Sequence, residues 1–393
     1  MSDDFVFTSE SMTAGHPDKL CDQVSDAIVD HYLMQDPNAR IVAESVVASG
    51  VMFISTHFAS PVTLDITDIA RQVVREIGYP KDIFDADACT IMTSFSDHTA
   101  TDYVALDFDK LTEEYLDRLV SKHQVTVFGY ACTQTPDLMP LPIWLAHKLA
   151  AKLDSKEVKK ALPYLLPDAK AQVGVEYHDC KPTRVHSITL VASQSDPDIG
   201  VEQLRSDLLE EAIEPVFKKV DWALDGDSKI SVNPEGLLIG GGPSAHSGLT
   251  GRKTGVDSYG EFSRHNGAAL SGKDPLRIDR VGAYAARYVA KNLVAAGLAE
   301  ECEVVLSYAV GVAGPVSVRV RTFGTGKLAG SELVSLLNEH FDLRLGAIVR
   351  DFGLTRLPSK EAGFYQRLAC YGHMGRKDIK APWEATDRAA RLT

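Results

Sequence analysis

The most informative stretch of the chain is Gly248-Leu249-Thr250-Gly251-Arg252-Lys253. Its glycines allow the backbone to approach a bound group closely, and Arg252 and Lys253 place two positive charges beside that backbone. A second turn of this kind follows as Ser271-Gly272-Lys273-Asp274-Pro275. Together the two turns predict a site for a polyanion such as the triphosphate of a nucleotide.

A third turn, Gly15-His16-Pro17-Asp18-Lys19, lies far upstream and brings different chemistry. An aspartate on a turn is a hard oxygen ligand that suits Mg²⁺. Taken alone, Asp18 would more often belong to the first turn of the helix that Pro17 begins. Arg252 and Lys253 alone would more often lie on a solvated turn. The occurrence of all three turns in one chain favours the nucleotide site.

Composition excludes several classes of protein. The chain has 393 residues, of which 45% are hydrophobic, so it is long enough for two or three domains with a sizeable core. A net charge of -13 argues against a general nucleic-acid or membrane partner and makes local basic clusters informative. We expect a cytoplasmic protein without a transmembrane helix, because the sequence shows no signal-peptide pattern, no long apolar run and no C-x-x-C pair.

Hydrophobic spacing predicts an α+β protein built from three similar α/β domains. Strand pairs with tight turns favour mixed or antiparallel sheets over a parallel Rossmann sheet, with helices packed on one face. The predicted boundaries are 1–105, 115–238 and 239–390, and we expect the chain to exchange segments between these domains.

Individual elements follow from periodicity and capping residues. The first helix starts at Pro17 and carries Leu20, Val24 and Ile28 on one face, with Asp22, Asp26 and Asp30 on others. Further helices are predicted over 65–78, 140–153, 201–220, 275–296 and 331–340. Strands are predicted within 40–58 as a hairpin, and over 88–95, 125–133, 171–177, 185–193, 304–310 and 316–322.

The common nucleotide-binding motifs are missing. Gly324-Thr325-Gly326-Lys327 is followed by Leu328 instead of Ser or Thr, and it lacks the full P-loop spacing. No G-x-G-x-x-G fingerprint follows a predicted strand, and neither G-x-S-x-G nor H-E-x-x-H occurs. Nucleotide binding would therefore use another route.

Motifs along nearly the whole chain resemble those of the methionine adenosyltransferases, or S-adenosylmethionine synthases. Besides the three turns, the matching motifs are Phe7-Thr8-Ser9-Glu10-Ser11, Phe128-Gly129-Tyr130-Ala131, Leu145-Ala146-His147-Lys148-Leu149, Pro167-Asp168-Ala169-Lys170, Ala283-Tyr284-Ala285-Ala286-Arg287 and Tyr371-Gly372-His373. They occur in the family's order, so no single motif has to carry the resemblance.

The resemblance implies a reaction and its requirements. The family transfers the adenosyl group of ATP to the sulfur of methionine, and the triphosphate that leaves is then hydrolysed. The implied cofactors are two Mg²⁺ per site and K⁺. The implied assembly is a homodimer or homotetramer whose sites are shared across the subunit interface.

The resemblance also implies roles for residues. The catalytic positions are His16, Lys170, Arg252 and Lys273. The ATP-binding positions are Glu10, His16, Asp168, Lys170, His246, Arg252, Lys253, Ala269 and Lys273. The methionine-binding positions are His57, His123 and Arg277. The metal positions are Asp18 and Asp279 for Mg²⁺ and Glu44 for K⁺. His147 is expected to be structural.

The chain departs from the family on the methionine side. His57, His123 and His246 stand where the family has carboxylates, and Arg277 stands where it often has lysine. A guanidinium can bind the substrate carboxylate bidentately. A neutral imidazole can accept one hydrogen bond from a substrate ammonium, whereas an imidazolium cannot.

Three functions therefore stay open. A divergent methionine enzyme is favoured because the triphosphate residues are intact. An adenosyltransferase for a related sulfur compound and a non-catalytic nucleotide-binding subunit are the alternatives, and the retained His16, Lys170 and Asp279 argue against the latter. The glutamine with which the family's mobile loop contacts methionine has no clear counterpart in 96–123.

Overall fold

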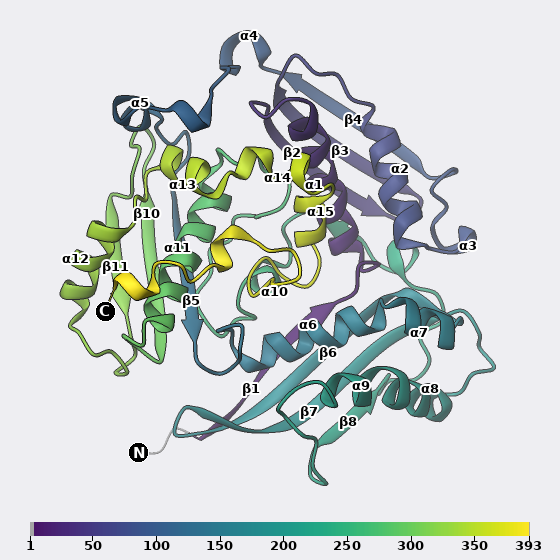
Figure 1. The fold of residues 1–393 in the computed structure, drawn as a ribbon. Coiled ribbons are helices and arrows are strands. Elements are labelled where there is room, and N and C mark those ends of the chain that lie inside the picture. The colour runs from purple at the N-terminus through teal and green to yellow at the C-terminus, as the bar shows by residue number, and fades with distance from the viewer. Residues whose placement is uncertain (1–3, 393) are drawn as a thin grey trace.

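The computed structural model describes residues 4–392 and contains three separate sheets (Figure 1). The first has the order β1 (Phe5–Met12), β6 (Leu165–His178), β7 (Lys181–Gln194) and β8 (Lys229–Val232). The second has the order β4 (Thr90–Asp97), β3 (Val51–Ala59), β2 (Arg40–Ala48) and β9 (Gly248–Leu249). The third has the order β11 (Ser317–Arg321), β10 (Glu301–Tyr308) and β5 (Val125–Cys132).

The sheets are mixed or antiparallel, as predicted. Only the pairs β7–β8 and β3–β4 are parallel among the paired strands of residues 4–392. The longer helices are α1 (Pro17–Gln35), α2 (Ile66–Ile77), α6 (Leu141–Leu153), α8 (Val201–Leu208), α11 (Ile278–Ala295), α12 (Gly330–His340) and α13 (Leu345–Phe352). The shorter helices are α3 (Lys81–Phe84), α4 (Thr99–Asp102), α5 (Glu113–Arg118), α7 (Lys156–Ala161), α9 (Glu214–Phe217), α10 (Thr254–Asp257), α14 (Leu357–Lys360) and α15 (Phe364–Leu368).

Each sheet combines strands that are far apart in the sequence. β1 pairs with β6, β5 pairs with β10, and β9 pairs with β2. The three sequence segments that we predict as domains therefore exchange strands with one another. The boundaries between the three domains remain a prediction from the sequence.

Helices cover the apolar face of each sheet. α1 packs on β2, α6 packs on β1 and β6, and α11 packs on β5 and β10. The largest cluster of buried apolar side chains joins α1, α2 and α11, and a second cluster lies between α6 and the first sheet. Within residues 4–392, no helix has both the length and the apolar composition needed to cross a bilayer.

Two helices differ from their predicted form. The helix expected over 201–220 is divided by a π-helical turn, Leu209–Ile213, and its last part ends at Phe217. Pro215 explains this division, because proline has no N–H to donate and its ring clashes with the preceding turn. The helix expected from residue 275 begins at Ile278, since Asp274 instead forms a turn that accepts the Leu276 and Arg277 amides.

The first helix differs in burial. Its apolar residues face the core as expected, but Asp22, Asp26 and Asp30, which we predicted on other faces, are buried as well. α1 is therefore enclosed on nearly all sides, and its acidic residues must find partners inside the protein.

Close packing of β5 on α11 gives a test of the fold. A Cβ atom built on Gly129 would lie 2.0 Å from the carbonyl carbon and oxygen of Ala286. We expect Gly129→Ala to lower the free energy of unfolding by about 1–3 kcal/mol or more, because the two backbones would have to separate. Gly50→Ala is the control, since nothing lies within 4 Å of its Cβ position. Equal urea midpoints for the two variants would contradict this packing.

Candidate active site

The first basic turn lies against the start of α1. The amide of Leu249 donates to Oδ1 of Asp18 at 3.0 Å, and the amide of Gly251 donates to Oδ1 of Asp22 at 2.8 Å. The side chains that follow return toward the same helix. An amino group of Arg252 lies 3.6 Å from Asp18, and Nζ of Lys253 lies 3.7 Å from it.

The second basic turn lies beside the first, along the same edge of the second sheet. The amide of Gly272 donates to Oδ1 of Asp26 at 2.8 Å, while its carbonyl accepts from the Ala43 amide on β2. The two turns meet at Ala269. Its carbonyl accepts from Nζ of Lys273 at 2.5 Å, and a Cβ atom on Gly251 would lie 2.4 Å from its Cβ. The structure thus brings Arg252, Lys253, Ala269 and Lys273 together.

His16 caps α1 in a form that suits a hydrogen-bond donor. Its Nδ1 accepts from the amide of Asp18 at 3.2 Å, so the proton of a neutral ring is on Nε2. Burial, together with the charge of Lys170, lowers the pKa of His16 to about 2. At neutral pH His16 is therefore an uncharged imidazole that donates from Nε2.

A second histidine lies beside this ring. The ring centroids of His16 and His246 are 4.9 Å apart, and Nε2 of His246 lies 2.9 Å from Oδ2 of Asp168. The same oxygen accepts from the amide of Gly242 at 2.8 Å. Asp168 therefore fixes both a loop and the second imidazole.

Ligand atoms of His16, Asp168 and His246 lie within 4.8 Å of one another, a spacing that could hold a metal ion. Two observations favour an anion there instead. Lys170 and Lys253 lie close enough to depress the pKa of His16, so their positive charge opposes a cation. The lone pair of Nδ1 is already used by the Asp18 amide, which leaves an N–H pointing outward.

A further group forms at the start of α11. Asp279 is buried in the first turn of that helix, and its Oδ1 lies 3.0 Å from Nδ1 of His123. Burial lowers the pKa of Lys273, and the neighbouring carboxylates of Asp279 and Glu44 oppose that shift. Lys273 thus lies among the residues assigned to metals by resemblance.

The carboxylates fit the implied Mg²⁺. Within residues 4–392, no hydrogen bond reaches Oδ2 of Asp18 or of Asp279. Hard carboxylate oxygens are the ligands that Mg²⁺ prefers, and the nearest cation to Oδ2 of Asp18 is Nζ of Lys253 at 3.7 Å. Glu44 lies exposed on β2 and offers the same chemistry to K⁺.

The residues assigned to methionine do not form a cluster like that of the residues assigned to the triphosphate. His57 lies exposed on β3 and stacks on His98 at a centroid distance of 6.1 Å. Arg277 is half-buried before α11 and has no hydrogen bond or ion pair from its guanidinium in the described chain. It lines a cavity of about 340 Å³ together with Arg40 and Leu276.

Sequence reasoning missed the buried charges behind the site. Nζ of Lys19 lies 2.7 Å from Asp22 and 2.6 Å from Asp257, and all three side chains are almost fully buried. Asp26 and Arg280 form a second buried pair at 2.6 Å. The signal for them was an aspartate at every fourth position of α1, a like-charge spacing that destabilises a helix unless partners are present. The structural role expected for His147 holds, since this buried ring bonds Oγ of Ser11 at 2.8 Å.

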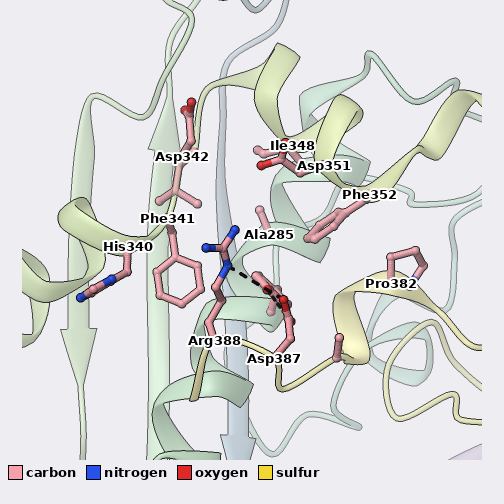
Figure 2. A pocket seen from close by; sticks show the side chains of 13 residues that line it. Ala285, His340, Phe341, Asp342, Ile348, Asp351, Phe352, Pro382, Asp387 and Arg388 are labelled. Carbon is pink, nitrogen blue, oxygen red and sulfur yellow. Dashed lines mark hydrogen bonds and ion pairs between the residues drawn. The ribbon is translucent and has the colours of Figure 1, made fainter. Parts of the chain in front are cut away.

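Another cavity, of about 290 Å³, lies between α11, α13 and the chain after residue 381 (Figure 2). It contains none of the predicted site residues. Its carboxylates already have partners: Asp342 pairs with Arg344, Asp351 pairs with Arg350, and Asp387 accepts from the Tyr288 hydroxyl. We therefore do not locate the reaction in this cavity.

Three α+β units and a cationic cradle beside buried aspartates define a nucleotide-triphosphate-binding protein without a P-loop. Comparison with known sequences identifies the family. S-adenosylmethionine synthetase N-terminal, central and C-terminal domain profiles match residues 4–100, 118–238 and 240–385. The chain belongs to the S-adenosylmethionine synthetase family.

Named relatives align with the chain over nearly their whole length. The chain is 46% identical to the S-adenosylmethionine synthase of Gloeobacter violaceus, covering 99% of this chain and 97% of the relative. It is 48% identical to that of Parasynechococcus marenigrum, covering 97% and 94%. It is 45% identical to that of Synechococcus elongatus, covering 99% and 97%.

The state of His16 can be measured directly. Because its pKa is lowered to about 2, we expect the ring to stay neutral, with the proton on Nε2, from pH 8 down to pH 5. Nitrogen-15 NMR of the labelled imidazoles should show His16 among the rings that do not titrate in this range, beside the buried rings of His147 and His373, and its resonance should disappear in His16→Gln. A His16 ring with a pKa near the ordinary histidine value of 6.5 would contradict the buried, lysine-flanked geometry.

Proposed function

We propose that this protein synthesises S-adenosylmethionine from ATP and methionine. The observation that carries the proposal is the meeting of both basic turns, with Lys253 and Lys273, beside His16 and Asp18 at the start of α1. Membership of the family and relatives named S-adenosylmethionine synthase support the same reaction.

The proposed step forms a bond between the methionine sulfur and C5′ of ATP. The C5′–oxygen bond breaks, and its electron pair leaves with the intact triphosphate, which is then hydrolysed to phosphate and diphosphate. Because charge develops on the leaving oxygen, a fixed donor at that point lowers the barrier. We assign this role to the Nε2–H of His16, since its Nδ1 is already occupied.

The cations bind the leaving group. We assign Lys170, Arg252, Lys253 and Lys273 to the triphosphate, where their charges offset those of the phosphates. Asp18 and Asp279 would hold two Mg²⁺ and Glu44 would hold K⁺, and bound Mg²⁺ would neutralise further phosphate charge. Glu10, Asp168, His246 and Ala269 complete the proposed ATP contacts.

On the amino-acid side, we assign the substrate carboxylate to Arg277, whose guanidinium has no partner in the described chain. His57 and His123 are assigned to the amino group. A related thioether is the second candidate substrate, favoured because histidines replace carboxylates that would pair with an ammonium. Relative rates for a panel of thioethers would separate the two substrates.

We also propose that two or four copies assemble. One row of apolar side chains runs across all four strands of the second sheet: Met92, Phe53, Val46 and Leu249. All four are between 39% and 54% exposed, although such a continuous apolar row is normally covered. Glu44 and His57 share this face, so a second copy on it would lie next to the site. We also propose a cytoplasmic location and the domain boundaries 1–105, 115–238 and 239–390.

The reaction is tested by incubating the protein with ATP, methionine, Mg²⁺ and K⁺ and measuring S-adenosylmethionine by mass spectrometry. We expect product from the wild type, and a loss of at least about 10²-fold in kcat for Asp18→Asn and Lys273→Ala. Asp18 would hold a Mg²⁺ that neutralises the leaving triphosphate, and Lys273 offsets its charge directly. Lys377→Ala, at an exposed ion pair, is the control. Absence of product from the wild type would overturn the proposal, and unchanged turnover in either site variant would remove that residue from it.

The assembly is tested by light scattering after gel filtration. Met92 is 54% exposed on the apolar row, and Met34 is 45% exposed near the end of α1. A charge buried at an interface is costly, so we expect Met92→Glu to shift the protein toward the monomer and Met34→Glu to leave the wild-type mass. A monomeric wild type, or a full-size Met92→Glu assembly, would contradict this surface as the interface.

A further inference from the structure

We infer that Asp22 and Asp26, two buried residues of α1, are positioning residues that hold the triphosphate-binding turns through their backbones. The inference rests on the proposed function and adds to it two residues that do not touch substrate. It follows from the contacts made by the aspartate row, by which we mean Asp18, Asp22, Asp26 and Asp30 of α1.

The aspartate row lies along one side of α1, because residues four apart are neighbours on a helix. All four are at most 2% exposed. Each accepts a backbone amide hydrogen from a distant segment: Asp18 from Leu249, Asp22 from Gly251, Asp26 from Gly272, and Asp30 from Tyr365 and Gln366. Three of the four therefore bind the two basic turns.

Asp22 fixes the first turn just before its cations. Its Oδ1 accepts from the amide of Gly251, the residue that precedes Arg252, at 2.8 Å. Its other oxygen lies 2.7 Å from Nζ of Lys19, which also pairs with Asp257 in α10. The carboxylate cannot turn away from Gly251 without leaving the lysine.

Asp26 holds the second turn from both sides of Lys273. Its Oδ1 accepts from the amide of Gly272, and its two oxygens bind Arg280 at 2.6 and 3.0 Å. Arg280 in turn donates to the carbonyl of Lys273 at 2.9 Å. The peptide unit before Gly272 and the one after Lys273 are thus tied to one buried ion pair, which fixes the backbone from which the Lys273 side chain extends.

The turn itself leaves no room for adjustment. Gly272 has φ = 76°, and a Cβ atom there would lie 2.0 Å from the carbonyl oxygen of Ala43. Arg280 also follows Asp279 directly in α11, so the same ion pair sets the start of the helix that carries the proposed metal ligand. Movement of this pair would shift Lys273 and Asp279 together.

Asp30 serves as a control that distinguishes an effect on the position of the turns from an effect on the stability of the fold. It is on the same helix, equally buried, and accepts two backbone amides, but those amides belong to α15, which contains no proposed site residue. Loss of the Asp30 carboxylate disturbs a buried acceptor of the same helix without moving a phosphate ligand. It is therefore a matched control.

The experiment compares Asp26→Asn, Asp22→Asn and Asp30→Asn in the full-length protein. Asparagine keeps the size of the side chain and one acceptor oxygen, but it cannot bind Arg280 or Lys19 as a charged carboxylate. A misplacement of about 1 Å can reduce a rate by about 10²-fold. We expect Asp26→Asn to lose about 10- to 100-fold in kcat/KM for ATP, with the KM for methionine within about threefold of wild type. The kcat/KM for ATP should also fall in Asp22→Asn.

Asp30→Asn should keep kcat/KM for ATP within about threefold of the wild type, because its amide partners lie in α15. Equal kinetic losses in Asp30→Asn and Asp26→Asn, or wild-type kinetics in Asp26→Asn, would overturn the inference. Where Asp26→Asn does not fold, Arg280→Lys replaces it, because lysine keeps the buried charge but cannot bind Asp26 and the Lys273 carbonyl together. The same kinetic loss is expected from it.

A readout independent of turnover separates this inference from the proposed function. Calorimetry with inorganic triphosphate should show weaker binding to Asp26→Asn than to Asp30→Asn by at least about tenfold. This difference should appear even if the wild type forms no S-adenosylmethionine, in which case the reaction fails and the positioning role stands. Equal triphosphate affinities would reject the positioning role whatever the reaction.

Discussion

The candidate site depends on buried carboxylates that bind backbone amides. Four aspartates spaced along one helix would repel one another, and burial would raise that cost further. The cost is offset because each carboxylate accepts at least one amide hydrogen, and because Lys19 and Arg280 enter the core as counter-charges. The same contacts fix the two turns that carry Arg252, Lys253 and Lys273. The buried aspartates thus hold in place the turns that carry the cations of the site.

This arrangement explains how a chain with a net charge of -13 can present a cationic cradle. Part of the acidic excess is buried, where burial raises the pKa of Asp30 to about 7. At the start of α1, burial together with the charges of Lys170 and Lys253 lowers the pKa of His16 and keeps it neutral. An uncharged donor amid cations suits a leaving group that gains negative charge during the reaction.

Much of the architecture could be predicted from sequence. The β2–β3 hairpin and the helix capped by Asp65 follow from local patterns, and the structure has both. The resemblance also identified the cations that the two turns bring together. Local patterns could not reveal the exchange of strands between sheets, because β1 and β6 lie far apart in the sequence and pair only in the folded protein. They also could not show that Asp22 and Asp26 face inward, since the backbone amides that they accept lie more than 200 residues away. Nor could they show that His57 stacks on His98 or that His123 bonds Asp279.

The central claim is that the aspartate row holds both basic turns, and amide hydrogen exchange tests it most directly. The account predicts that the amides of Leu249, Gly251 and Gly272 exchange slowly in the protein without ligand, and that Asp26→Asn speeds exchange at Gly272 while leaving Tyr365 and Gln366 protected. Exchange at all three turn amides as fast as in an exposed loop, or no change at Gly272 in the variant, would contradict it.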